Sequence, residues 1–363
     1  MTRTFDPGCG RDGPPIASRR ELLRRAGLGF GSLALAGLML DDGLLAASAS
    51  EPDGPALSPL PQGRARSVIF LFMGGGPSQV DTFDPKPELD RLQGRDVPES
   101  IARGVPRIAR SPLKNLYASP YTFARHGESG LPVSELFPEV ARHVDDLCVL
   151  RSCRHDSPIH APAEYIATTG TQVGDRPSLG AWLTYGLGSE NRDLPGFIVF
   201  VAGETGRPVA WSSGFLPARY QGTVVQAEGI PHLSPPPGLA PEGRRAQLDL
   251  IDRLNRRHHE RDPDNSELEA RIRSYELAFR MQSAAPEAFG LAHETPETQA
   301  LYGLDREETR EFGTYCLLAR RMVERGVRFV QVRSGGWDAH NNLVKNHTPQ
   351  AQKTDKPIAG LLA

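Results

Sequence analysis

The chain has almost no net charge. Its 363 residues include 42 Lys and Arg against 44 Asp and Glu, so the formal net charge at pH 7 is −2. A balance this close to zero gives no global electrostatic attraction to nucleic acid or to an anionic membrane surface. We therefore expect no nucleic-acid partner.

Cysteine is scarce, with four residues in the whole chain. Cys148 and Cys153 lie close together in the sequence, and an exported protein could oxidise such a pair. The simpler interpretation is that Cys148 and Cys316 are buried apolar side chains within a strand and a helix, and we favour it. Cys9 falls in the N-terminal leader.

No apolar run is long enough to span a membrane. The uncharged run at 26–40 has 15 residues, whereas a membrane-spanning helix needs about 20. Arg19 and Arg20 precede this run, and 47–49 (Ala-Ser-Ala) offers a small-residue cleavage site. The pattern predicts a twin-arginine export signal over residues 1–49, rather than a basic tail with an uncleaved anchor helix. We therefore expect recognition by the twin-arginine translocase, no stable membrane span and a periplasmic or extracellular location.

Nucleotide-binding motifs are missing as well. Residues 74–76 are three glycines that follow an apolar run, but neither Gly-Lys-Ser/Thr nor a properly spaced GxGxxG accompanies them. A tight turn that exposes backbone N–H groups toward an anion explains these glycines better than a nucleotide loop does.

What the chain does contain is an alternation of apolar strands and helices. Residues 50–66 are rich in Pro, Gly and Ser and predict a flexible lead-in to a domain over 67–363. Strands are predicted at 67–73, 147–151, 196–201 and from 327 to the glycine pair at 335–336. Helices are predicted at 134–143, 161–169, 178–187, 242–259, 264–282 and 307–325. The alternation predicts an α/β fold, specifically a three-layer α/β/α sandwich with a mostly parallel central sheet.

Asp338 and His340 are the strongest candidate site residues. They follow a buried strand, and the carboxyl ends of strands in α/β proteins usually hold ligands. His347 and Asp355 come later, and oxygen and nitrogen donors of this kind suit a divalent metal. Asp81 follows the first strand, and two interpretations of it are equally good: a metal ligand or a solvated loop residue. Asp84 precedes Pro85 and is explained as a helix cap.

A second cluster of polar residues spans 155–160, His-Asp-Ser-Pro-Ile-His. It precedes a predicted helix, whose N-terminus favours anions and activates a nucleophile. Ser157 is therefore a candidate nucleophile, and His160 or His155 a ligand or base. The alternative is that Asp156 or Ser157 only caps the helix.

Four ordered blocks of sequence resemble the family called domain of unknown function 1501. They lie at 67–87, 155–170, 176–195 and 326–362, and the twin-arginine leader is also typical of that family. The family is similar to the alkaline phosphatase and sulfatase superfamily, which binds divalent metals at the C-terminal ends of a central sheet. Two departures stand out. Gly74 and Gly75 occupy the place of acidic ligands, and no arginine completes a formylglycine motif after Ser157.

The resemblance implies an exported metal-dependent hydrolase of phosphate or sulfate esters, acting on a small-molecule or polysaccharide ester. Asp81, Asp338 and His340 would hold zinc, calcium or manganese. Ser157 would attack, and His160 would support the metal or the leaving group. The alternative is an exported binding protein that keeps the fold and has lost the chemistry.

The end of the chain predicts a truncated domain. Residues 355–363, with Pro357 early, predict the first half of an amphipathic helix that no stop signal closes. The resembling family continues with a further strand and metal-binding block, so we expect a C-terminal part beyond residue 363.

Overall fold

The computed structural model describes residues 65–103, 114–202, 207–226, 241–261 and 265–363. The predicted export signal at 1–49 and nearly all of the lead-in lie outside the described residues. Among the described residues, no helix is both long and apolar enough to cross a membrane.

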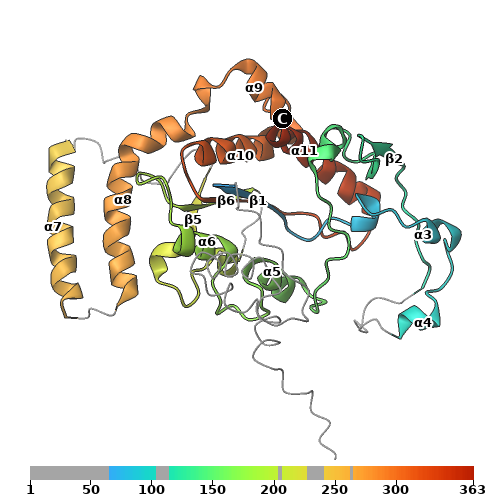
Figure 1. Cartoon of the computed structure of the whole chain (residues 1–363), viewed down its shortest axis with the longest axis horizontal. Coiled ribbons are helices and arrows are strands. Elements are labelled where there is room, and N and C mark those ends of the chain that lie inside the picture. The colour runs from blue at the N-terminus through green and yellow to red at the C-terminus, as the bar shows by residue number, and fades with distance from the viewer. Residues whose placement is uncertain (1–64, 104–113, 203–206, 227–240, 262–264) are drawn as a thin grey trace, which may run out of the picture.

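A four-stranded parallel sheet forms the centre of the molecule (Figure 1). Its strands, in spatial order, are β1 (Val68–Met73), β6 (Phe329–Ser334), β4 (Phe197–Ala202) and β5 (Thr223–Val225). All three pairings are parallel, and Met73 and Ala202 are both in register with Ser334. Strands β1, β6 and β4 therefore end together at one edge, which confirms the predicted α/β fold with a mostly parallel sheet.

Helices cover both faces of this sheet. Alternate residues of β4 point to opposite faces, and Ile198 and Phe200 pack into one hydrophobic cluster while Phe197 and Val199 pack into another. Figure 1 shows α10 (Glu307–Glu324) and α11 (Leu343–Leu362) on one side of the sheet, and α5 (His160–Thr169) and α6 (Leu179–Leu187) on the other.

Helix α10 shows why these segments fold as they do. Apolar side chains recur at helical spacing, so Leu317, Leu318 and Met322 are all fully buried against the sheet. Glutamates in the first turn suit the positive end of the helix dipole. Gly326, with φ of +81°, allows the chain to leave the helix and enter β6.

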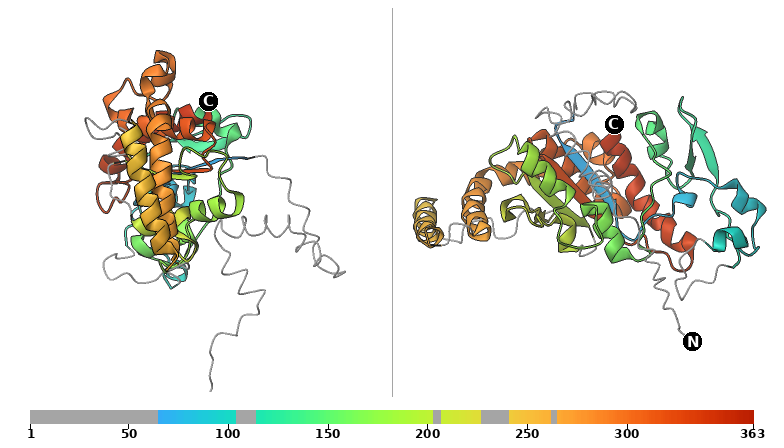
Figure 2. Two further views of the ribbon diagram at one scale, coloured as in Figure 1. Left: turned by 90° about the vertical axis from the view of Figure 1, so that its left-hand side faces the viewer. Right: turned by 60° about the horizontal axis from the view of Figure 1, so that its bottom comes forward.

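A long helical hairpin projects from one end of the molecule (Figure 2). It consists of α7 (Pro241–His259) and α8 (Ser266–Phe289). The side chain of Asn265 caps α8, since its Oδ1 accepts the Leu268 N–H at 3.0 Å. The described residues also contain an antiparallel hairpin of β2 (Phe123–His126) and β3 (Leu131–Ser134). The short helices are η2 (Gln79–Asp81), α3 (Pro87–Arg91), α4 (Glu99–Ala102), η3 (Val140–Asp146), η4 (Pro208–Trp211), η5 (Ala218–Tyr220), η6 (Leu291–His293) and α9 (Pro296–Leu301).

Several local predictions are wrong. Residues 147–151 form no strand, because they meet no partner strand; Leu150 is 67% exposed and Cys148 is exposed too. Cys316 is buried as predicted. Only the 3-10 helix η3 overlaps the helix predicted at 134–143. Helix α3 begins at Pro87 after Lys86, so Asp84 is not its cap and instead pairs with Lys86 at 2.7 Å.

The final helix is longer than predicted. Helix α11 begins at Leu343 and contains both Pro349 and Pro357, so Pro357 does not mark its first turn. Each proline removes one helical hydrogen bond, and packing against α10 and η3 compensates for that loss.

A buried ion-pair network joins α10 to the segment before it. Arg321 is buried, pairs with Glu294, and donates to the carbonyl oxygens of Ala288 (3.0 Å) and Glu287 (2.6 Å). Arg320 binds the other oxygen of Glu294 at 2.8 Å. Burial alone would raise the pKa of Glu294, but the two guanidinium groups together lower it.

We expect Glu294→Gln to destabilise the protein by about 3 kcal/mol, because Arg321 would be left buried without a counter-charge. A carboxyl group with a lowered folded-state pKa contributes stability above its unfolded pKa of about 4.3, and loses it as the pH falls through the folded value. Urea unfolding of the variant should therefore depend less on pH below about 4.3 than the wild type does. The control Glu311→Gln removes an exposed partner of Lys353 and should cost less than about 1 kcal/mol. Equal losses in both variants would contradict the network.

Candidate functional site

The candidate site lies where β1 and β6 end. The Gly74 N–H donates to the Ser334 carbonyl at 2.8 Å, and the Trp337 N–H donates to the Gly74 carbonyl at 3.1 Å. Gly75 adopts φ of +97°, and a Cβ there would lie 2.4 Å from the Asp338 backbone nitrogen. The two strand-end loops are therefore in direct backbone contact, which fixes the position of Asp338 at the edge of the sheet.

Three of the predicted residues meet at this edge. The Nε2 atoms of His160 and His340 lie 3.1 Å and 2.9 Å from Oδ2 of Asp338. The donor atoms of the three residues all fall within 4.8 Å of one another, and they form the only such group of three among the described residues. The side chains of His160, Asp338 and His340 are 56%, 43% and 78% exposed. We call this set the His160–Asp338–His340 cluster.

The donor set of the cluster fits a divalent metal. Two imidazole nitrogens and one carboxylate oxygen are ligands that zinc and other first-row metals accept. Atoms that share one ion at about 2.1 Å lie about 3.0 to 3.4 Å apart. The separations of 3.1 Å and 2.9 Å found here are compatible with a shared ion, and they are also the distances of hydrogen bonds between imidazole and carboxylate.

Asp81 lies outside the cluster. It is buried in η2, where its Oδ2 accepts a hydrogen bond from the Ser78 hydroxyl at 2.5 Å. Its Oδ1 is buried without a hydrogen-bond partner. The predicted role of Asp81 as a metal ligand stays a prediction.

Ser157 lies in the turn that leads into α5. Its hydroxyl donates to the Ile159 carbonyl at 3.0 Å and its oxygen accepts the Ile159 N–H at 3.3 Å. Its own N–H donates to Nδ1 of His155 at 3.3 Å. The side chain is buried. These contacts stabilise the turn, and the predicted role of Ser157 as nucleophile stays a prediction.

His347 and Asp355, which follow the cluster in the sequence, are not part of it. His347 is buried against Trp337, and its Nε2 accepts the Ser78 N–H at 2.9 Å. Burial lowers the pKa of His347, although Asp81 opposes the shift. Asp355 accepts the N–H groups of residues 139 and 140, both at 2.9 Å, and burial raises its pKa despite these bonds. Both residues hold α11 against neighbouring segments.

One contact that positions a residue of the cluster was not predicted from the sequence. Arg333 is buried on β6, and its Nη2 binds Oε1 of Glu164 at 2.5 Å. Its guanidinium also lies over the rings of Phe72 and Trp211, at 4.7 and 5.6 Å. Glu164 follows His160 by one helical turn, so both lie on the same face of α5. The Arg333–Glu164 pair therefore anchors the helix that carries His160. The available signal was an arginine, Arg333, inside a mostly apolar strand.

A comparison with known families agrees with the resemblance of the four sequence blocks. The family described as "Protein of unknown function (DUF1501)" matches residues 65–363. No curated protein and no solved structure matches the chain.

We expect Gly75→Ala to destabilise the protein by about 2 kcal/mol more than Gly76→Ala does. Both glycines have positive φ, so both variants carry the same conformational penalty. Only at Gly75 does the new Cβ meet the Asp338 backbone, because nothing lies within 4 Å of a Cβ at Gly76. Guanidinium unfolding of the two variants measures the difference. Equal stabilities would mean that the loops are not in close contact.

Proposed function

Since the chain belongs to the DUF1501 family, we propose that it is an exported, metal-dependent hydrolase of phosphate or sulfate esters. The proposal includes a three-layer α/β/α sandwich of the alkaline phosphatase and sulfatase type. The observation that carries it is the His160–Asp338–His340 cluster, which joins α5 to the loop after β6.

The position of the cluster supports this proposal. Asp338 and His340 follow the central strand β6, and ligands of open α/β sheets bind outside the carboxyl ends of strands. Helices on both faces of the parallel sheet agree with a three-layer arrangement. The proposed metal site is mononuclear, with His160, Asp338 and His340 as its ligands from the protein.

The chemistry divides between the metal and the chain. When bound, a divalent ion supplies charge that stabilises the ester oxygens and activates a nucleophilic oxygen. His160, Asp338 and His340 would hold the ion, and the Arg333–Glu164 pair keeps α5 from moving His160 away. Ser157 would turn from the Ile159 carbonyl and attack phosphorus or sulfur through its hydroxyl oxygen. The ester bond to the alcohol would break, and the Ser157 hydroxyl proton would pass to the departing alcohol oxygen. Water would then hydrolyse the covalent ester and restore the Ser157 hydroxyl.

The sequence before the described residues supports export. Arg19 and Arg20 precede a short apolar run, as a twin-arginine signal requires. We propose that the translocase exports the chain to the periplasm or beyond. Small-molecule or polysaccharide esters would be its substrates there.

A second candidate function is ligand binding without catalysis. It is favoured by the end of β1, where the superfamily carries acidic metal ligands and this chain has Gly74 and Gly75. The close approach of Gly75 to the Asp338 backbone leaves no space for a side chain at that position. A binding protein would keep the fold and need no second set of ligands.

We expect the purified full chain to bind about one zinc or manganese ion, and His340→Ala or Asp338→Asn to weaken that affinity at least tenfold. Removing one of three ligands leaves too few donors for tight binding. Equilibrium dialysis with elemental analysis measures the stoichiometry. The control His258→Ala changes an exposed histidine of α7 outside the cluster and should leave metal binding unchanged. Unchanged metal affinity in the cluster variants would contradict the proposed metal site.

Turnover of aryl phosphates and aryl sulfates distinguishes the two functions. We expect Ser157→Ala to lower kcat at least about a thousandfold while metal binding stays intact, because only the attacking oxygen is lost. The exposed Ser152 supplies the matched control, Ser152→Ala. A Ser157→Ala variant with normal kcat and a lower unfolding temperature would mean that Ser157 only stabilises the turn before α5. Metal-loaded wild-type protein with no turnover would favour the binding protein.

A further inference from the structure

A large groove lies beside the N-terminal ends of β4 and β5, whereas the His160–Asp338–His340 cluster lies beyond the C-terminal end of β6. It has a volume of about 800 Å³ and is bounded by α8, by η5 and by the end of α6. Gly196, Phe197 and Thr223 also line it, and these residues enter or begin β4 and β5. Because a six-residue strand is about 20 Å long, the groove is a separate site.

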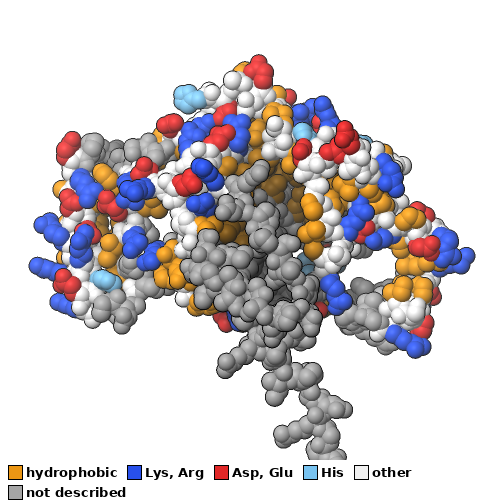
Figure 3. Space-filling model, in the orientation of Figure 1, with side chains coloured by type: hydrophobic (Ala, Val, Ile, Leu, Met, Phe, Trp, Pro, Cys, Tyr) orange, Lys and Arg blue, Asp and Glu red, His pale blue; other side chains and the backbone are white. Residues whose placement is uncertain are grey.

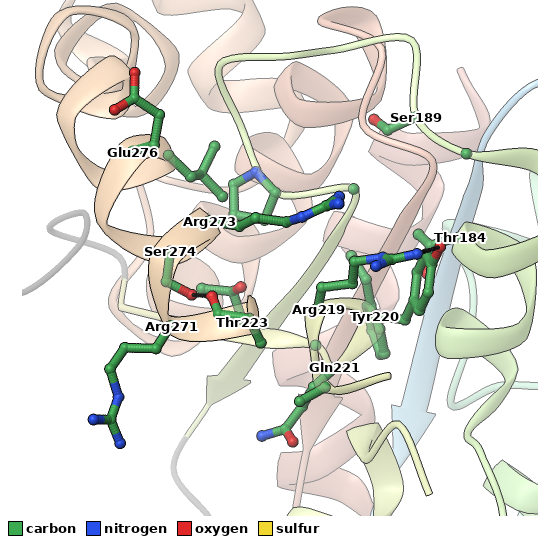
Figure 4. Close-up of a pocket in the computed structure, with 18 of the residues that line it drawn as sticks. Thr184, Ser189, Arg219, Tyr220, Gln221, Thr223, Arg271, Arg273, Ser274 and Glu276 are labelled. Atoms are coloured by element: carbon green, nitrogen blue, oxygen red, sulfur yellow. Dashed lines mark hydrogen bonds between the residues drawn. The ribbon is translucent and has the colours of Figure 1, made fainter. Parts of the chain in front are cut away.

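The groove is rich in positive charge. Arg219, Arg271, Arg273 and Arg280 line it, against the single acidic residue Glu276. Figure 4 shows Arg219 and Arg273 extending into the space between α8 and the sheet, while Glu276 points away from that space. The Glu276 carboxylate pairs with Arg245 of α7 at 3.3 Å and with Arg280 at 3.8 Å. Arg280 also lies 3.6 Å from Asp193, so it is an ion-paired member of the lining. Figure 3 shows Lys and Arg side chains, interspersed with acidic ones, over the end of the molecule formed by α7 and α8, at the left of the view.

Neutral polar side chains complete the lining. Thr184, Ser189, Gln221, Thr223 and Ser274 contribute hydroxyl and amide groups. The hydroxyls of Thr184, Ser189 and Ser274 already donate to backbone carbonyls, so they offer only acceptor positions. Gln221 and Thr223 can offer donors as well, and together these groups suit a ligand that carries many hydroxyls. The groove therefore offers both cationic and neutral hydrogen-bonding groups over one continuous surface.

An exposed aromatic patch continues from the groove. It consists of Trp182, Tyr185, Phe215 and Tyr220, whose rings pack edge to face at 5.2 to 6.2 Å between centroids. Tyr220 belongs to both the patch and the groove, and Arg219 lies 4.7 Å above its ring. Tyr185 and Phe215 are 48% and 64% exposed. Exposed contiguous rings of this kind mark a binding surface.

We infer that this groove binds an anionic oligosaccharide, one that carries sulfate groups on its sugars. Guanidinium groups bind these oxyanions through paired hydrogen bonds. The hydroxyl and amide groups recognise sugar hydroxyls, and the aromatic rings pack on the apolar faces of sugar rings. Single-stranded nucleic acid also stacks on aromatic rings in basic grooves, so an oligonucleotide of the same charge is the competing ligand in the test.

Binding of a heparin-derived hexasaccharide to the full chain tests the inference. We expect titration calorimetry to detect binding that weakens with added salt and is lost with the desulfated hexasaccharide. The double variant Arg219→Gln and Arg273→Gln should bind at least about tenfold more weakly. The matched control, Arg253→Gln with Arg257→Gln, removes the same charge from exposed positions of α7 and should bind as the wild type does.

Four results would overturn the inference. They are no binding by the wild type, equal binding of the desulfated sugar, equal loss in the control pair, and tighter binding of a single-stranded oligonucleotide of the same charge. A further measurement needs no variant. The hexasaccharide should protect Arg219 and Arg273 of the wild type from an arginine-selective reagent, and unprotected side chains would also overturn it. Hydrolase activity enters neither test, so the result is independent of the proposed function.

Discussion

The structure depends on the parallel pairing of β1 with β6. These strands come from opposite ends of the described chain, yet all six residues of each are in register. The hydrogen bonds of Gly74 extend this pairing beyond the strands, to Ser334 on one side and Trp337 on the other. Backbone contacts of this kind leave no freedom for a side chain at Gly75. They carry Asp338 to the edge of the sheet in one fixed position, and the whole candidate site is built around that carboxylate.

The second constraint is electrostatic and comes from inside the sheet. Arg333 would be costly to bury alone, and the carboxylate of Glu164 on α5 offsets that cost. The pair therefore ties α5 to β6 at one geometry. His160 lies one turn before Glu164, so the same contact determines where its imidazole can reach. A solvent-exposed cluster thus rests on a buried ion pair, which is how an exposed site can keep a defined geometry.

The sequence predicted β1, β4, β6 and the main helices because their apolar periodicity is strong, as at 67–73 and 307–325. It missed the three-residue strand β5, which is too short to show a period. It failed at 147–151, where an equally apolar run has no neighbouring strand to pair with. Periodicity describes one segment, whereas a strand also requires a partner. The strand-end position of Asp338 and His340 was predictable for the same reason that β6 was. The meeting of His160 with Asp338 was not, because it depends on the packing of α5 against β6 through Arg333.

Parallel topology also explains why the two ends of the sheet, where the strands begin and where they end, differ. Strands β1, β6 and β4 all finish at the end that carries the His160–Asp338–His340 cluster, so chain segments leaving them converge there. At the other end, α8 and η5 flank the starts of β4 and β5 and leave the arginine-lined groove between them. The two ends share the rigid core of β4 but no lining side chain. A ligand in the groove can therefore be held without disturbing the backbone contacts that position Asp338.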